Sequence, residues 1–364
     1  MSDIRAEAST TAARAQIDLA GRLDAEGQHE EAINCLARAA GMGDAEALTV
    51  LGLRLVTGQN APFLPADGAR LLSDAVHAGG AAAAGHLAVL VGGGFHARQS
   101  WDQGLDLLQR SAELGSSSAA TQLRILAGAA GRQEESGSEA WADLRRRVDL
   151  SAWTGPPSIS ILSKSPSVRS VSGLVPPSAC AFVIGQSQAR LVGAELYDPE
   201  TAAAVLGQDT RLNRIANFGL ADTCLLNLVI QARISAAAGL PMNQMEAFAV
   251  LHYAPGEEYG EHFDFLDPAI PAYGEEIERA GQRVATCLLY LSEGYEGGET
   301  EFPRLGIRYK GRTGDALIFH STDEAGRPDV RSLHAGRPPT SGEKWLLSQF
   351  FRSRPVISLQ ARPH

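Results

Sequence analysis

Residues 248–265 read FAVLHYAPGEEYGEHFDF, and this stretch decides the fold expected for the second half of the chain. Its first six residues are mostly apolar and aromatic, which is typical of a buried strand, and the glycine-containing run after them is typical of a turn. Similar runs follow, and the expected strands are 248–253, 284–291, 316–320 and 345–352. Short antiparallel strands with glycine-rich connections favour a sandwich or barrel of the jelly-roll kind.

The same stretch carries His262 and Asp264, which stand two residues apart. On an extended segment both side chains point to one face, where they could bind a metal. His334 follows on a candidate later strand, and two imidazoles with one carboxylate suit non-haem Fe(II) and leave coordination positions open. Lys344 would place a fixed cation near such an iron, which an anionic co-substrate would explain.

An isolated His-x-Asp pair is more often solvated than metal-bound, so the surrounding motifs matter. They are Tyr253-x-x-Gly256-x-x-Tyr259-x-x-His262-x-Asp264, Arg283 to Leu291, Gly297-Gly298-Glu299-Thr300-Glu301-Phe302, Gly314-Asp315-Ala316, Leu333-His334-Ala335-Gly336 and Gly342-Glu343-Lys344-Trp345. In order and spacing, this set resembles the Fe(II)- and 2-oxoglutarate-dependent dioxygenases of the prolyl 4-hydroxylase type, over roughly residues 176–352.

The resemblance implies a double-stranded β-helix flanked by helices. It implies that His262, Asp264 and His334 bind iron and are also the catalytic residues. It further implies that Lys344 pairs with the distal carboxylate of 2-oxoglutarate. Three further residues sit where the family lines the co-substrate pocket, namely Tyr253, Thr286 and Tyr290. The implied reaction consumes O2, converts 2-oxoglutarate to succinate and CO2, and hydroxylates an unactivated C–H bond. Ascorbate is an optional further cofactor on the same resemblance.

The substrate is expected to be a prolyl or other amino-acid residue in a peptide or protein, or a small amino-acid-like molecule. Candidate substrate contacts are Tyr259, Tyr295, His320 and Arg352. Each of the last three could instead have a structural role: a hairpin turn at Tyr295, a hydrogen-bonded turn histidine at His320 and an exposed salt bridge at Arg352. The acidic segment 266–282 is either a mobile lid over the site or a solvated surface loop.

The first third of the chain shows a period of 36 residues, and the columns that carry it are Gly43, Gly79 and Gly115, Leu36, Leu72 and Leu108, and Ala47, Ala83 and Ala119. Each period predicts a helix, a turn at glycine and a second helix, and neighbouring pairs must stack into a solenoid to bury their apolar faces. Residues 15–130 resemble the Sel1-like branch of the tetratricopeptide-type repeats. The resemblance implies contact with a protein partner; alternatively, the helices only stabilise the second domain.

Together these patterns predict an α+β multidomain chain: a helical repeat domain at 15–130, a linker with possible short strands at 131–175, and the dioxygenase domain at 176–356. The net charge of -10 argues against nucleic acid and anionic membranes as partners. No signal peptide or long apolar run is present, and four scattered cysteines indicate neither zinc nor disulfides, so we expect a cytoplasmic protein. Two other functions stay open, a non-catalytic scaffold with a relic dioxygenase domain and a cupin-like metal enzyme that does not use 2-oxoglutarate.

Overall fold

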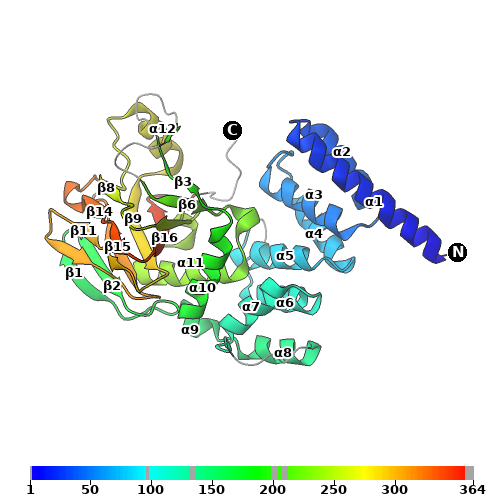
Figure 1. Cartoon of the computed structure of the whole chain (residues 1–364), viewed down its shortest axis with the longest axis horizontal. Helices are drawn as coiled ribbons and strands as arrows, with labels where there is room; N and C mark the ends of the chain where they lie inside the picture. The colour runs from blue at the N-terminus through cyan, green and yellow to red at the C-terminus, as the bar shows by residue number, and fades with distance from the viewer. Residues whose placement is uncertain (1, 96–97, 132–136, 198–203, 207–211, 357–364) are drawn as a thin grey trace. The chain divides into compact units, whose positions relative to one another are not determined.

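The computed structural model describes residues 2–95, 98–131, 137–197, 204–206 and 212–356, which form two compact units (Figure 1). The first unit holds the chain up to Leu150 together with Leu220–Leu228. The second holds Ser151–Gly219 and the described chain from Val229 onward. Among the helices of these ranges, none combines the length and the apolar character that a membrane span requires.

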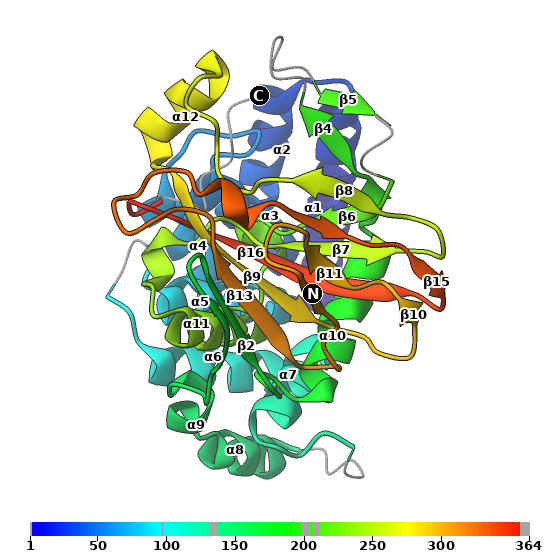
Figure 2. The ribbon, with the colours of Figure 1, turned by 90° about the vertical axis from the view of Figure 1, so that its left-hand side faces the viewer.

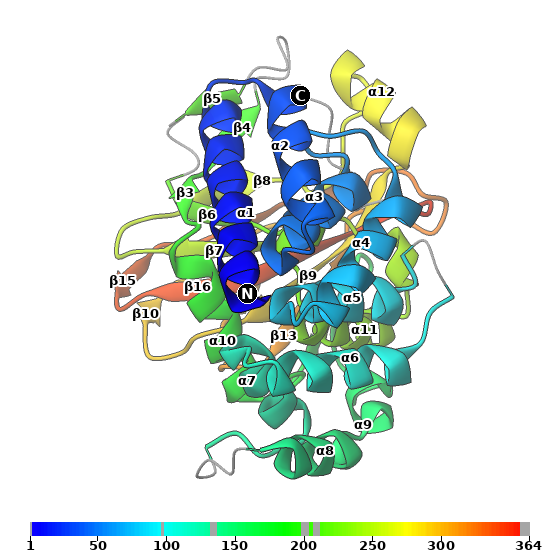
Figure 3. The same cartoon turned by 90° about the vertical axis from the view of Figure 1, so that its right-hand side faces the viewer.

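The first unit is built from helices that pack against one another in chain order (Figure 3). They are α1 (Ser2–Ala25), α2 (His29–Gly41), α3 (Ala45–Thr57), α4 (Pro65–His77), α5 (Ala81–Gly93), α6 (Trp101–Glu113), α7 (Ser117–Leu126) and α8 (Ser138–Arg147). Gly43, Gly79 and Gly115 follow α2, α4 and α6 with φ values of 80°, 90° and 98°, a left-handed backbone that glycine adopts without strain. The predicted helix–turn–helix period is therefore confirmed.

Small residues bring helices of neighbouring periods close together. A Cβ placed on Gly68 of α4 would lie 2.5 Å from the carbonyl oxygen of Gly52 in α3. One period later, a Cβ on Gly104 of α6 would lie 3.1 Å from the carbonyl oxygen of Ala88 in α5. The period aligns Leu36, Leu72 and Leu108, and each of these side chains is at most 1% exposed. The repeat in the sequence is thus a repeat of the packing between helices.

The second unit contains two antiparallel sheets that lie face to face (Figure 2). The main sheet runs in the order β1 (Ser160–Lys164), β2 (Ser167–Val171), β13 (Ala316–His320), β9 (Arg283–Tyr290), β16 (Lys344–Arg352), β7 (Ala249–Tyr253), β6 (Arg214–Asn217) and β3 (Val192–Gly193). The small sheet runs β12 (Ile307–Tyr309), β11 (Thr300–Phe302), β14 (His334–Gly336) and β8 (Tyr259–His262). Two short pairs complete the strands, β10 (Glu296–Gly297) with β15 (Pro339–Ser341), and β4 (Glu195–Tyr197) with β5 (Ala204–Leu206).

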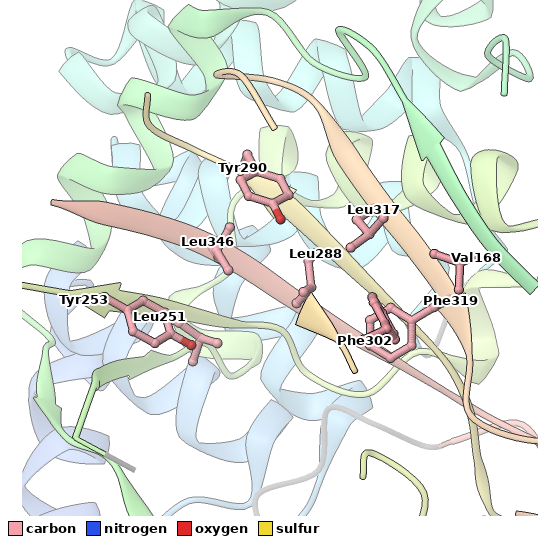
Figure 4. Close-up of a cluster of buried hydrophobic side chains, with 9 residues drawn as sticks. All are labelled: Val168, Leu251, Tyr253, Leu288, Tyr290, Phe302, Leu317, Phe319 and Leu346. Atoms are coloured by element: carbon pink, nitrogen blue, oxygen red, sulfur yellow. The ribbon is translucent and has the colours of Figure 1, made fainter. Parts of the chain in front are cut away.

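An apolar core fills the space between the main and small sheets (Figure 4). The main sheet contributes Val168, Leu251, Tyr253, Leu288, Tyr290, Leu317, Phe319 and Leu346, and Phe302 comes from the small sheet. Helices α10 (Pro177–Gln188) and α11 (Leu225–Ala238) also bond to the main sheet: Cys180 Sγ lies 3.9 Å from the Tyr290 carbonyl oxygen, and Gln231 Nε2 donates to Gln349 Oε1 at 2.8 Å. This is the predicted double-stranded β-helix with flanking helices.

The segment 131–175 contains more structure than the predicted linker. Its described part holds α8, the short helix α9 (Leu150–Thr154) and strands β1 and β2. Strand β2 pairs along its length with β13 of the main sheet, so these strands belong to the second unit. The second unit therefore begins at Ser151, before the predicted boundary at 176, because its sheet needs β1 and β2 as its outer strands.

Candidate functional site

Two histidines and one aspartate meet at the edge of the small sheet. His262 and His334 are direct partners on the paired strands β8 and β14, and Asp264 follows β8 by two residues. The Nε2 atoms of His262 and His334 lie 3.6 Å and 3.5 Å from the two carboxylate oxygens of Asp264. One nitrogen or oxygen from each residue can be chosen so that all three lie within 4.8 Å of one another. This spacing can hold a single metal ion.

The second nitrogen of each histidine ring is held by a backbone carbonyl. His262 Nδ1 lies 2.7 Å from the oxygen of Gly260, and His334 Nδ1 lies 3.0 Å from the oxygen of Ser332. A carbonyl only accepts, so each Nδ1 donates its proton there, and Nε2 is left as the ring atom that can bind a metal. This arrangement fixes the tautomer and the ring orientation that metal binding requires.

Asp264 is buried and held in its ionised form. The hydroxyl of Thr286 on β9 donates a hydrogen bond of 2.6 Å to Asp264 Oδ2. Burial by itself would raise the pKa of Asp264, but the neighbouring His334 and His262 and the Thr286 hydrogen bond outweigh it and hold that pKa below its usual value. The carboxylate is the form that binds a metal, so the electrostatics match the geometry.

Aromatic rings enclose the two histidines. Tyr259 stacks on the His262 ring with centroids 3.5 Å apart and an interplanar angle of 10°. Phe302 and Phe319 of the core contact the His334 ring at centroid distances of 5.5 Å and 4.6 Å. The structure thus places Tyr259, a predicted substrate contact, beside the metal-binding candidates, and it limits the motion of both imidazoles.

Lys344 is a buried cation at the start of β16. Its side chain is fully buried, and its Nζ has no hydrogen-bond partner among the described residues. Lys344 lies over the ring of Tyr253, its partner on β7, with Nζ 4.9 Å from the ring centroid. Burial lowers the pKa of Lys344 to about 7, against the opposing charge of Glu299. Burying a charge without a partner costs folding free energy, and the carboxylate of an anionic ligand would supply the missing partner.

The three residues predicted to line the co-substrate pocket have different surroundings. Tyr253 lies against Lys344, whereas Thr286 bonds to Asp264. The Tyr290 hydroxyl lies 2.8 Å from Thr300 Oγ1 and donates to the carbonyl oxygen of Tyr309 at 3.3 Å. Tyr290 therefore ties the main sheet to the small sheet by its hydroxyl, in addition to its place in the core.

The structure corrects two predicted substrate contacts. His320 ends β13 on the face opposite Phe319, and its Nε2 lies 3.5 Å from a guanidinium nitrogen of Arg169. Because side chains alternate along a strand, His320 points away from the interior that Phe319 helps to fill. Arg352 is only 2% exposed, and its guanidinium is paired with Glu246 and Glu276 inside the protein.

Tyr295 differs from its predicted role as well. A substrate wall should be accessible, but Tyr295 is only 1% exposed and its hydroxyl is buried without a partner among the described residues. A Cβ on Gly298 would lie 2.8 Å from its ring, and the same Cβ would lie 3.5 Å from Cδ of Lys344. Tyr295 thus lies on the Lys344 side of the site and is buried there.

A buried ion-pair cluster behind the site was not predicted. Glu246 binds Arg283 through hydrogen bonds of 2.8 Å and 3.0 Å and also pairs with Arg352. Arg352 reaches further, to Glu276 at 2.8 Å and to the Gly281 carbonyl at 2.7 Å. These partners are far apart in the sequence and share no motif spacing, so no sequence signal could have joined them.

The acidic segment 266–282 contains a helix and has its ends tied together. Helix α12 (Pro271–Ala280) forms its middle, and Glu276 of this helix is the residue that Arg352 binds. The side-chain amide of Gln282 accepts from the backbone N–H of Leu266 through Oε1 at 2.7 Å and donates from Nε2 to the Leu266 carbonyl at 2.6 Å. The segment is therefore an ordered loop with a fixed base, two residues after Asp264.

Comparisons with known proteins place this geometry in a family. Residues 248–352 match the model of the 2OG-Fe(II) oxygenase superfamily. A protein of Acanthamoeba polyphaga mimivirus assigned to the prolyl 4-hydroxylases is 31% identical over 185 residues, which cover 50% of this chain and 73% of that protein. Among solved structures, a viral collagen prolyl hydroxylase of Paramecium Bursaria Chlorella virus-1 in complex with 2OG is 25% identical, with a TM-score of 0.40 over 51% of this chain and 96% of that one.

A similarity of a different kind was also found among solved structures. A Sel1 repeat protein from Oxalobacter formigenes is 18% identical, with a TM-score of 0.30 over 40% of this chain and 63% of that one. The family assignment rests on the viral relative, which is 31% identical with 73% of its length covered, and on the oxygenase match, which includes His262, Asp264 and His334. The chain belongs to the prolyl 4-hydroxylase family of 2-oxoglutarate- and Fe(II)-dependent oxygenases.

Proposed function

We propose that this chain is an active Fe(II)- and 2-oxoglutarate-dependent hydroxylase whose metal ligands are His262, Asp264 and His334. The observation that carries the proposal is the combination of this triad with a fully buried, unpartnered cation, the Nζ of Lys344, among the described residues. A relic domain would have no reason to keep both Nε2 atoms directed at Asp264 or to leave a costly charge inside its core. An intact site favours catalysis over a scaffold role.

The donor set fits the groups that the family uses. Two imidazoles and one carboxylate are the facial set of non-haem Fe(II), and three coordination positions stay open. When bound, iron with 2-oxoglutarate supplies the oxidising chemistry: one oxygen atom of O2 enters the substrate C–H bond, the other enters succinate, and CO2 is released. The protein itself supplies binding, orientation and a site from which water is excluded.

Each residue has a defined task in this proposal. Gly260 and Ser332 hold the histidine tautomers through their carbonyls, and Thr286 keeps Asp264 ionised and oriented. Lys344 would neutralise the distal carboxylate of 2-oxoglutarate and so fix the direction in which the co-substrate lies. Binding the anion would also restore the proton affinity of Lys344, because an opposite charge favours the ammonium form.

For the substrate, we propose a prolyl residue in a peptide or protein. The support is the family itself, since the viral relative is assigned to the prolyl 4-hydroxylases. The helical repeats of the first unit suit recruitment of a protein partner, as stacked repeats often do. Use of ascorbate and a cytoplasmic location remain predictions of the same proposal.

Ligand binding tests the site before any substrate is known. Anaerobic titration of the full chain with Fe(II) and then 2-oxoglutarate should produce a weak visible charge-transfer band. His334→Ala should abolish iron binding, whereas Lys344→Met should retain iron and lose only the response to 2-oxoglutarate. Iron content that is the same in the wild type and His334→Ala would refute the assignment of the triad.

Activity tests the rest of the proposal. Proline-containing peptides and cell extract would be incubated with the loaded enzyme, and products would be compared by mass spectrometry with those of His334→Ala. We expect peptides that gain one oxygen atom on proline only with the wild type, together with release of succinate. Oxygen added to another residue would keep the hydroxylase and overturn the prolyl substrate.

A further inference from the structure

A second polar group without a partner lies next to Lys344. The hydroxyl of Tyr295 is buried, and like Lys344 Nζ it makes no hydrogen bond within the described residues. Buried hydroxyls nearly always have a partner, so two orphaned groups in one neighbourhood indicate that a ligand binds there. The triad does not involve Tyr295, and the expected lining residues were Tyr253, Thr286 and Tyr290.

The two groups meet at one glycine. A Cβ on Gly298 would lie 2.8 Å from Tyr295 Cε2 and 3.5 Å from Lys344 Cδ, so the tyrosine ring and the lysine stem both contact this residue. Glu299, the next residue, acts electrostatically on both side chains. Tyr295 directly precedes β10 and Lys344 begins β16, so the two side chains border one small region beside Gly298.

The backbone of Tyr295 is held firmly. Lys310 Nζ donates to the Tyr295 carbonyl, and it lies 4.6 Å from the centroid of the tyrosine ring. Gly342 packs directly on the other side, since a Cβ there would come within 2.9 Å of Tyr295 Cα. A side chain fixed in this way does not turn out to solvent to satisfy its hydroxyl, so the partner must come to it.

We propose that Tyr295 is a second anchor for the distal carboxylate of 2-oxoglutarate, with its hydroxyl donating to the carboxylate that Lys344 neutralises. This inference rests on the proposed function, because it assigns a further residue to the same co-substrate. A carboxylate has two oxygens, so one can accept from the ammonium and the other from the phenol. Burial, with help from Glu299, raises the pKa of Tyr295, which keeps the phenol protonated and able to donate.

The test compares two tyrosine-to-phenylalanine variants of the full chain loaded with Fe(II) under argon. Tyr295→Phe removes the orphaned hydroxyl and keeps the ring that packs on Gly298. Tyr309→Phe is the matched control, because its half-buried hydroxyl bonds to Ser170 within the protein. Calorimetric titration would measure the affinity for 2-oxoglutarate and for 2-oxopentanoate, a ligand of equal chain length that lacks the distal carboxylate.

We expect Tyr295→Phe to weaken 2-oxoglutarate about tenfold or more, as loss of a hydrogen bond to a charged group does, and to leave 2-oxopentanoate within about twofold. Tyr309→Phe should bind both ligands as the wild type does. Without ligand, Tyr295→Phe should melt at the same temperature as the wild type or higher, since it removes an unsatisfied buried group. A purely structural hydroxyl would give a lower melting temperature and an unchanged affinity.

The outcomes separate this inference from the proposed function. If the wild type binds iron and 2-oxoglutarate and Tyr295→Phe binds them equally well, the anchor role is wrong and the hydroxylase proposal stands. Equal weakening of 2-oxoglutarate and 2-oxopentanoate would also overturn the anchor role, because the effect would not depend on the distal carboxylate. A wild-type protein that binds iron but fails to bind 2-oxoglutarate would refute both the anchor role and the proposed function.

Discussion

Replacing the buried Lys344 with methionine should make the ligand-free protein more stable. Lys344 is fully buried, and burial lowers its pKa from 10.5 to about 7. At 1.36 kcal/mol per pH unit, this difference corresponds to a charge penalty of about 5 kcal/mol on the folded state. Methionine has a similar length and no charge, so the change in packing should cost less than about 1.5 kcal/mol.

The pH dependence gives the prediction its sign. The folded-state pKa lies below the unfolded value, so the unfolded chain holds the proton more tightly and the folded protein gains stability as pH rises between them. The penalty is therefore complete below about pH 7, falls to about 2 kcal/mol at pH 9 and disappears above about pH 10.5. The gain in unfolding free energy from Lys344→Met should therefore decrease with pH in the same way.

Hydrogen exchange of the β16 amides across a urea series measures this effect in the second unit alone. Strand β16 lies in the middle of the main sheet, so its amides exchange only when that unit opens. The control is Lys164→Met on the outer strand β1, where the side chain is exposed and no gain is expected. A Lys344→Met variant that is less stable at neutral pH, or whose gain is the same at pH 7 and 9, would refute the buried charge.

Three further changes probe the surroundings of the site. Thr286→Val removes the 2.6 Å bond to Asp264, so the depressed pKa of that carboxyl should rise. Mn(II) should then bind about 10- to 100-fold more weakly and be released at a higher pH on acidification, as calorimetry between about pH 5 and 8 would show. Gly298→Ala should destabilise the second unit by more than Gly306→Ala in thermal melts, since both have positive φ (72° and 65°) but only the first Cβ meets neighbours within 4 Å. Glu276→Gln should speed amide exchange in α12 by loosening its ion pair to the sheet, with iron content unchanged; protected amides would show that the pair does not hold this helix.

The sequence was most informative where function or packing repeats at short range. The spacing of His262 and Asp264 placed both on one segment, and the glycines of the 36-residue period all adopt the left-handed turn expected of them. Period and alternation determine such features directly, because they depend on neighbours along the chain. The fold class of the second unit followed from the family resemblance as much as from these patterns.

Features that depend on distant partners were not readable. Arg352 is buried in an ion-pair cluster with Glu246, which stands 106 residues away in the sequence, and no sequence pattern joins the two. His320 was misplaced because the end of a strand does not reveal which of its faces is covered. Tyr295 resembled an exposed turn residue until its contact with Gly298 was seen.

Two hydrogen bonds between the side-chain amide of Gln282 and the backbone of Leu266 close the base of the loop between these residues, so the loop can change with little effect on the rest of the fold. Both ends are fastened to one buried amide, so the strain of a longer or shorter insert stops there and does not reach Asp264. Doubling the length of such a loop adds only about 0.6 kcal/mol of closure entropy. The sequence between these two residues can therefore vary while the residues of the His262, Asp264 and His334 set stay where they are.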